Sequence, residues 1–312
     1  MKLAEDMIAT FDGIFGRHPG HRPAHAKGGL YSGHFTPTPE AATLSTAAHF
    51  HRPTTPIFVR FSNSTGLPKL PDSDPQADPR GMAVRFMLGE RQHTDIVSHS
   101  ANGFPTRDGT EFLEFLRAVV ASGAPDAPTP KPIEVFLASH PAALKFVQLP
   151  KPAPVSFATE QYFALSAYKF IDAQGNARYG RYTIVPEAGV QHMDDKTQKQ
   201  QQPNFLFDEL TTRVQSTPAV FHIDLQLAED GDTTDDVTIH WPAERRVVRL
   251  GTLTLDSAVA DDAAAMQRII FDPIPRTEGI EASEDPLLEF RAAVYIISGQ
   301  RRRADPPVTK DA

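Results

Sequence analysis

The sequence predicts an α+β protein, a large antiparallel β-barrel with helices inserted between its strands and appended after them. Short segments rich in β-branched and aromatic residues fall into two groups along the chain, as expected of strands. Segments with helical spacing of apolar residues separate these groups and follow them. Runs of strands with inserted helices favour a barrel over an alternating α/β sheet.

Seven to nine strands are expected, in two groups on either side of a helical region. They are residues 24–35, 57–62, 82–88, 94–97, 167–172, 178–185, 219–227, 238–240 and 249–255. Gln174-Gly175-Asn176 has the composition of a hairpin turn. The second group therefore begins with two antiparallel neighbours.

The expected helices share apolar residues three or four positions apart. They are a first helix ending near Gly16, then 110–121, 133–138, 142–147, 204–215 and 285–303, the last with Ser283 as its N-cap. The proline-rich segment 125–132 predicts a rigid connector, and the polar segment 191–202 an exposed loop. We predict three parts: an N-terminal helical arm (1–20), a barrel with inserted helices (21–260) and a C-terminal segment (261–312).

Composition excludes several classes of protein. The chain has 312 residues and a net charge of −8, so nucleic acid is not an expected partner. No apolar stretch approaches the roughly 18 residues of a spanning helix, and Glu5 and Asp6 stand where a signal peptide would be basic. We therefore expect no membrane association and a cytoplasmic location, or a periplasmic one if a signal had been trimmed.

The chain contains no cysteine. This excludes disulfides, thiolate nucleophiles, zinc–thiolate sites and cysteine-ligated or covalently attached heme. Any metal must be held by His, Tyr, Asp, Glu or Met, and the twelve histidines include no HExxH pair.

Residues Arg291 and Tyr295 lie four positions apart in the last predicted helix and therefore share one face. A guanidinium beside a phenol favours the phenolate, a hard anionic ligand suited to ferric iron. On spacing alone, a tyrosine packed at the end of an amphipathic helix is the commoner interpretation.

Two further motifs carry candidate polar residues. In RPAHAKGG, His25 lies where a loop enters a strand, and Gly28 and Gly29 allow the close approach of a flat group. In VRFSNSTG, Arg60 and Ser62 share one strand face, and a buried arginine there would need an anion. Taken alone, an ordinary core or surface histidine and an edge-strand arginine are the simpler interpretations.

In their order along the chain, these motifs resemble those of the heme catalases. The matching segments are RPAHAKGGLYSGHF, TPIFVRFSNSTG, DPRGMAVRF, TDIV, RDGTEF, HWPAERRVVRLGTLTLDS, FDPIPRTEGIE and RAAVYIISGQRR. The resemblance covers roughly Arg22 to Arg303, nearly the whole chain. It is greatest to the short catalase-related peroxidases, which resemble the catalase barrel without its carboxy-terminal helical domain.

The resemblance implies a heme b site. His25 matches the distal histidine, Ser62 the serine that orients it, and Phe112 the phenylalanine that stacks on the heme. Tyr295 matches the proximal iron ligand, with Arg291 bonded to it. Three arginines match residues that pair with the heme propionates: Arg22, Arg60 and Arg302.

The chain departs from the family pattern at the distal asparagine. An ungapped reading of DIVSHSANGFP places His99 there, and Asn102 could supply the amide only with a local gap. Ile296 follows the ligand tyrosine where the family has proline, and Ala24 replaces a valine. These departures put peroxide dismutation in doubt more than peroxide cleavage.

The resemblance implies a heme peroxidase that reduces organic hydroperoxides and hydrogen peroxide, with weak catalase activity. Its partners would be a peroxide and a small-molecule electron donor, and NADPH is not expected. Alternatives are a lipid hydroperoxide isomerase or lyase, like catalase-related allene oxide synthases, a non-catalytic heme-binding protein, or a barrel that has lost heme. A short amino-terminal arm disfavours an interlocked tetramer, but a homo-oligomer is compatible with the sequence.

Overall fold

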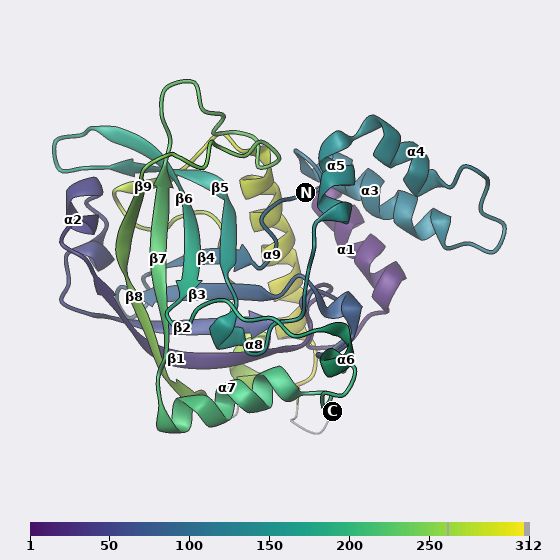
Figure 1. Cartoon of the computed structure of the whole chain (residues 1–312), viewed down its shortest axis with the longest axis horizontal. Helices are drawn as coiled ribbons and strands as arrows, with labels where there is room; N and C mark the ends of the chain where they lie inside the picture. Colours follow the sequence, from purple (N-terminus) through teal and green to yellow (C-terminus); the bar gives the residue numbers. More distant parts are fainter. Residues whose placement is uncertain (261, 309–312) are drawn as a thin grey trace.

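A computed structural model describes residues 1–260 and 262–308 and has one antiparallel sheet of nine strands. The strands are β1 (Gly28–Pro37), β2 (Thr55–Ser62), β3 (Gly81–Met87), β4 (His93–His99), β5 (Tyr162–Ile171), β6 (Ala177–Pro186), β7 (Ala219–Leu227), β8 (Val247–Ala258) and β9 (Ile280–Ala282). Eight of them follow one another around a barrel in the order β4-β3-β2-β1-β8-β7-β6-β5, and β9 adds to β5. The predicted antiparallel barrel with helices is confirmed (Figure 1).

The barrel closes where β4 meets β5, at the pair His99 and Phe163. Only this pair joins the two strands, because β5 bends through an irregularity between Ala164 and Tyr168 and turns to pair with β9. An irregularity of this kind re-aims neighbouring side chains. One end of the closing seam therefore carries His99.

Strand alternation fills the barrel with apolar side chains and sends polar ones outward. On β2, Val59 and Phe61 are fully buried in the interior core, which receives side chains from β1 to β8. Arg60 and Ser62 point to the opposite face of the same strand and are nevertheless buried, at 4% exposure each. Something outside the barrel must therefore cover this face.

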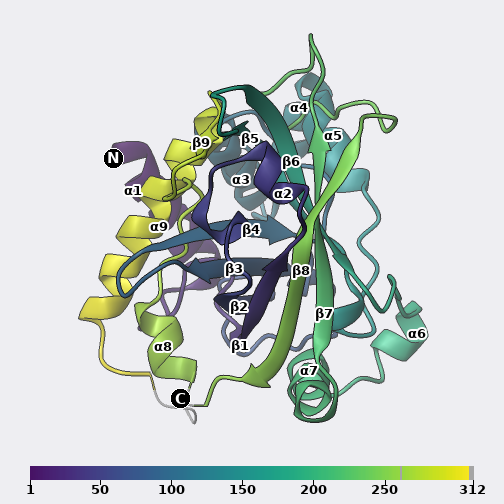
Figure 2. The same cartoon turned by 90° about the vertical axis from the view of Figure 1, so that its left-hand side faces the viewer.

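The helices provide that cover. They are α1 (Lys2–Phe15), α2 (Ala41–Leu44), α3 (Gly109–Ser122), α4 (Pro132–Ser139), α5 (Pro141–Gln148), α6 (Asp195–Gln198), α7 (Phe205–Ser216), α8 (Asp262–Arg268) and α9 (Pro286–Ala304), with 3-10 turns at Ala48–Phe50, Pro75–Ala77 and Phe157–Thr159. Helices α1, α3 and α9 share a second apolar cluster that includes Met7, Leu113 and Val294. Figure 2 shows α1 and α9 beside β3 and β4, and Figure 1 shows α3 to α5 as a lobe standing away from the barrel.

The structure corrects four details of the sequence prediction. Residues 238–240 are not a strand, because Asp236 accepts hydrogen bonds from the Thr238 backbone and hydroxyl and folds the segment into a turn. The first strand begins at Gly28, four residues later than expected. The N-cap of α9 is Asp285, whose carboxylate accepts from the Leu287 N–H, and the predicted cap Ser283 lies two residues before it. Segment 191–202 contains the short helix α6.

Helices α2 and α8 and strand β9 were not predicted, because each is too short to show a period. None of the helices within the described residues has the length and apolar character that crossing a membrane requires.

Candidate active site

A cavity of 440 Å³ lies between the outer face of β2–β4 and the helices α1, α3 and α9. This volume is within the roughly 300–1,000 Å³ range of sites that enclose small ligands. All nine predicted site residues line it: His25, Ser62, His99, Arg22, Arg60, Phe112, Arg291, Tyr295 and Arg302. They come from positions up to 280 residues apart (302 minus 22), so only the closed fold brings them together.

His25 reaches the cavity from the loop before β1, in a left-handed backbone conformation with φ 56°. Its N–H donates to the Ser64 carbonyl (2.9 Å), and its own carbonyl accepts from Arg60 Nη2 (2.8 Å). The ring atom Nδ1 lies 3.1 Å from Ser62 Oγ. A residue other than glycine rarely adopts this conformation, so the surrounding bonds hold it there.

Burial dominates the chemistry of His25. The ring faces the cavity and is enclosed by protein, which lowers its pKa to about 3, and the positive charges of Arg60 and Arg22 act in the same direction. The imidazole is therefore neutral at neutral pH and has one unprotonated nitrogen. Such a ring can accept a proton from a bound molecule.

His99, at the end of β4, is a second imidazole on the cavity. The Ala101 N–H donates to its Nδ1 (3.2 Å), and burial and then Arg291 lower its pKa to about 3. A neutral ring that accepts at Nδ1 carries its proton on Nε2. His99 is thus set as a hydrogen-bond donor. Asn102, the alternative considered from sequence, is exposed and does not line the cavity.

Arg291 and Tyr295 lie one turn apart on α9. Nε and Nη2 of Arg291 lie 3.3 and 3.2 Å from the phenolic oxygen and donate to it. Burial alone would lower the pKa of Arg291, but its interactions with Tyr295 and then Tyr168 exceed this effect and raise the pKa. The phenolic oxygen therefore lies beside a permanent positive charge, as the helical spacing predicted.

Three arginines crowd one end of the cavity. In the described part of the chain, Arg22 and Arg60 donate only to backbone carbonyls, and Arg302 to carbonyls and the Ser298 hydroxyl. The Nε atom of Arg60 is buried with no partner. Burial, and then repulsion by the other two arginines, lower the pKa of Arg22 well below its usual value. Burial, and then a neighbouring arginine, also lower the pKa of Arg60 to about 9 and the pKa of Arg302 to about 10. Such a cluster calls for anionic groups.

Aromatic rings form the wall between the cavity and the α3–α5 lobe. Phe112 and Phe115 on α3 stack with centroids 6.4 Å apart, and Phe104 meets Phe112 at 5.0 Å. Phe146 of α5 lies against Phe104 and also lines the cavity. This side of the cavity therefore accepts flat or apolar groups.

The residues fit a heme. Its propionates would neutralise the arginine cluster, including the unpaired Arg60 Nε, and its iron would need only one side-chain ligand, Tyr295. In residues 1–260 and 262–308, no group of three or more His, Cys, Asp or Glu could hold a bare metal ion. The donor set therefore suits a metal that is largely coordinated by its own macrocycle.

The catalase family profile matches residues 6–308. This chain belongs to the catalase family. It is 36% identical to the catalase-related peroxidase of Mycolicibacterium paratuberculosis, over 96% of this chain and 94% of that protein. It is 32% identical to the catalase-related peroxidase of Synechococcus elongatus, over 96% of this chain and 88% of that protein. The resemblance seen in the motifs is confirmed.

Solved catalases share the fold. A fungal catalase and catalase A from Saccharomyces cerevisiae each superpose with a TM-score of 0.80, at 22% and 21% identity, over 95% of this chain. The chain spans 61% and 63% of the length of these two catalases. These residues therefore share the fold of the solved catalases.

Sequence reasoning missed two contributors to the site. Gly81 of β3 is one, because a Cβ there would lie 2.4 Å from Ser62 Oγ and 2.9 Å from His25 Nδ1. The other is the C-terminal end of α8, where the carbonyls of Met266, in the helix, and Ile269, just after it, accept from Arg22. The glycine in DPRG was the only signal for the first, and carbonyl groups leave no signal in a sequence.

Proposed function

We propose that this protein is a heme peroxidase that reduces organic hydroperoxides and hydrogen peroxide, with weak catalase activity. The observation that carries the proposal is one enclosed cavity that holds an arginine-paired tyrosine, two neutral histidines and three arginines that have no carboxylate partner among the described residues. A member of this family that resembles catalase-related peroxidases over nearly its whole length is an oxidoreductase acting on peroxide.

Heme b is the proposed cofactor. Tyr295 would hold its iron, Arg291 would donate hydrogen bonds to the phenolic oxygen, and Arg22, Arg60 and Arg302 would bind its propionates. When bound, the heme supplies the redox chemistry of the cycle by exchanging two electrons with the peroxide.

His25 moves the proton. Its Nδ1 would donate to Ser62 Oγ, which leaves Nε2 free to take the O–H proton of the hydroperoxide. As the O–O bond breaks, Nε2 returns this proton to the departing oxygen, which leaves as an alcohol, or as water from hydrogen peroxide. The low pKa of His25 keeps the ring neutral before the substrate arrives and makes the returned proton easy to release.

His99 complements His25. With its proton on Nε2, His99 donates a hydrogen bond into the cavity and cannot act as a base there. It would hold the peroxide oxygen while His25 takes the proton. A bulkier ring where catalases carry an amide changes how a second hydrogen peroxide would be placed as reductant. We therefore expect oxygen release to be slow.

The aromatic wall supports organic hydroperoxides as substrates. Phe104, Phe112 and Phe146 offer an apolar surface to an alkyl or aryl substituent. An apolar group leaving water for this surface would favour binding of the substituted peroxide over hydrogen peroxide.

The experiment compares two products in the purified protein loaded with heme. We expect dye oxidation by cumene hydroperoxide to exceed oxygen release from hydrogen peroxide, and vigorous oxygen release without dye oxidation would contradict the proposal. The absorption spectrum of Tyr295→Phe tests the ligand separately, because the wild-type ferric spectrum should be shifted or lost. A cytoplasmic location and a homo-oligomer stay predictions.

A further inference from the structure

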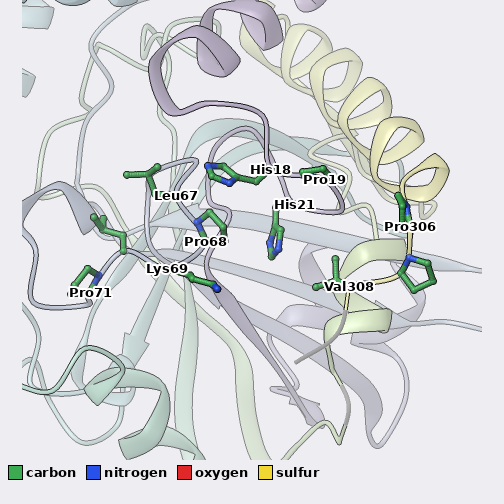
Figure 3. Close-up of a pocket in the computed structure, with 11 residues that line it drawn as sticks. His18, Pro19, His21, Leu67, Pro68, Lys69, Pro71, Pro306 and Val308 are labelled. Atoms are coloured by element: carbon green, nitrogen blue, oxygen red, sulfur yellow. The ribbon is translucent and has the colours of Figure 1, made fainter. Parts of the chain in front are cut away.

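A second pocket of 760 Å³ opens on the surface near the arginine end of the cavity. Three segments form it: His18–His21 after α1, residues 67–71 after β2, and Pro306–Val308 after α9. Figure 3 shows the ring of His21 between Pro68 and Val308, with Lys69 below it. None of the predicted site residues lines this pocket.

The walls are rigid and apolar, with positive or neutral polar groups. Five of the eleven lining residues are prolines: Pro19, Pro68, Pro71, Pro306 and Pro307. The polar residues are His18, His21 and Lys69, and no carboxylate lines the pocket among the described residues. A proline wall suits a flat ring, and the polar set suits a weakly acidic or anionic group.

The pocket wall is continuous with the cavity. A narrow hollow lies between the two and shares His18 and His21 with the pocket, and Arg22, Pro23 and Ser298 with the cavity. Burial and His18 lower the pKa of His21, a hydrogen bond with the Ala26 backbone opposes this, and the nearby charges of Arg60 and Arg22 lower it further. The Ala26 carbonyl accepts in turn from Arg60 Nη2 (3.3 Å). One layer of side chains therefore separates a ligand in the pocket from the arginine cluster.

The C-terminal wall of the pocket is anchored by one buried side chain. Gln267 Nε2 donates to the carbonyls of Arg302, Asp305 and Pro306, and its Oε1 accepts from the Val308 N–H (3.1 Å). The opposite side is tied to the same segment, because Asp305 accepts from Arg17 Nη2 (2.6 Å) and the Gly20 N–H (2.8 Å). The pocket is thus preformed rather than a gap beside a loose tail.

We propose that this pocket binds the electron donor of the peroxidase cycle, a small phenol or phenolic acid. This inference rests on the proposed function. The propionate edge held by the three arginines would be the part of the cofactor nearest the pocket, and electron transfer is fastest over the shortest distance. The phenol ring would lie against the prolines, and Lys69 would attract a carboxylate on the donor.

The step balances as two one-electron oxidations. Each phenol would give one electron to the cofactor and its O–H proton to the His21 ring, and would leave as a phenoxyl radical. His21 would pass the two protons on, and with the two electrons they convert the second peroxide oxygen to water. Two phenols and one hydroperoxide yield two phenoxyl radicals, one alcohol and one water. Burial, then His18, lower the pKa of His21, so this ring is neutral and can take the proton.

The first test is equilibrium binding of 4-hydroxybenzoate to the heme-loaded protein, measured by calorimetry. Lys69→Glu reverses a charge on an exposed side chain, and Val308→Trp fills the pocket from its edge. Each should weaken binding by about tenfold or more, since a lost charge contact or a blocked wall costs on the order of 1.4 kcal/mol. Lys131→Glu makes the same charge change on the exposed start of α4 and should leave binding unchanged.

The second test separates the two half-reactions by stopped-flow spectroscopy. Both pocket variants should lower the rate constant for 4-hydroxybenzoate oxidation relative to the rate constant for cumene hydroperoxide cleavage. Guaiacol carries no carboxylate. Val308→Trp should therefore still lower the rate constant for guaiacol oxidation, and Lys69→Glu should lower it less.

The outcomes distinguish this inference from the proposed function. Normal donor binding and oxidation in both pocket variants would overturn the pocket assignment and leave the peroxidase standing. Binding of 4-hydroxybenzoate that depends on Lys69, in a protein that does not cleave peroxide, would overturn the peroxidase and leave the pocket as a phenol site. Failure of the wild type to bind the probe would overturn the assignment directly.

Discussion

Replacing His25 with glycine should separate its chemical role from its backbone strain. His25 holds a left-handed backbone, with φ 56°, and places Nδ1 beside Ser62 Oγ. Glycine adopts this conformation freely, so His25→Gly removes the imidazole without demanding a new backbone. His25→Ala removes the same ring but keeps a Cβ at a positive φ.

The two variants should differ in stability and agree in kinetics. A Cβ in the left-handed region costs roughly 1–2 kcal/mol, so His25→Gly should be more stable than His25→Ala by about that amount. Both should cleave cumene hydroperoxide about 10²- to 10⁴-fold more slowly than wild type, the usual contribution of a positioned acid–base group. The upper part of this range is expected because His99, with Nδ1 occupied by the Ala101 N–H, offers no free nitrogen to replace the base.

The assay combines stopped-flow peroxide cleavage with urea unfolding of each variant. Heme uptake should be nearly intact in both, since the ring lost is not the proposed iron ligand. Added imidazole should recover part of the rate more readily in His25→Gly, where the larger space admits it. Peroxide cleavage at the wild-type rate in either variant, with heme bound, would refute the assignment of His25 as the proton carrier.

Three other predictions concern single residues. His49→Leu should resist acid better than wild type. Burial lowers the pKa of His49 from its ordinary 6.5 to about 3, and its buried Nδ1 has no partner among the described residues. The unfolded chain therefore binds a proton that the folded protein does not, and the wild type loses stability as pH falls from 6.5 toward 3. The stability difference should therefore move in favour of the variant by about 1.4 kcal/mol per pH unit below 6.5 in urea unfolding, and parallel curves would contradict this. Gly81→Ala should slow peroxide cleavage by about tenfold with heme retained, because the new Cβ displaces Ser62 or His25; an unchanged rate would show that the contact is not tight. His99→Leu should slow cleavage by about tenfold and His99→Asn should slow it less, since only asparagine keeps a donor; equal rates in the two variants would argue against a donor role.

The strands and the helix that carries Tyr295 could be predicted because their periods are long and regular. Strand alternation predicts that Arg60 and Ser62 share one face, helical spacing predicts that Arg291 lies beside Tyr295, and both are found. The strand predicted at residues 238–240 was wrong because this segment is too short to show a period. Thr238 and Ile239 are β-branched and Trp241 is aromatic, so the segment resembles a strand. The Asp236 side chain, however, accepts the hydrogen bonds of Thr238 that a partner strand would have accepted.

Other features of the site were beyond the reach of sequence patterns. The left-handed conformation of His25 depends on bonds to the Ser64 carbonyl and from Arg60, which lie far along the chain. The choice between His99 and Asn102 depended on where β4 ends, and element boundaries are the least regular part of a pattern. The phenol pocket is built partly from Pro306–Val308, a segment with no period of its own.

The position of Tyr295 on α9 has a consequence for the biosynthesis of the protein. During translation, β1 to β8 leave the ribosome before α9 does, and they can pair into the barrel before Tyr295, the proposed iron ligand, has been synthesised. His25, Ser62 and His99 would then lie on a barrel surface that α9 does not yet cover. Capture of the proposed cofactor would then be one of the last events in maturation, and a chain truncated before α9 would be an apoprotein with an exposed apolar flank.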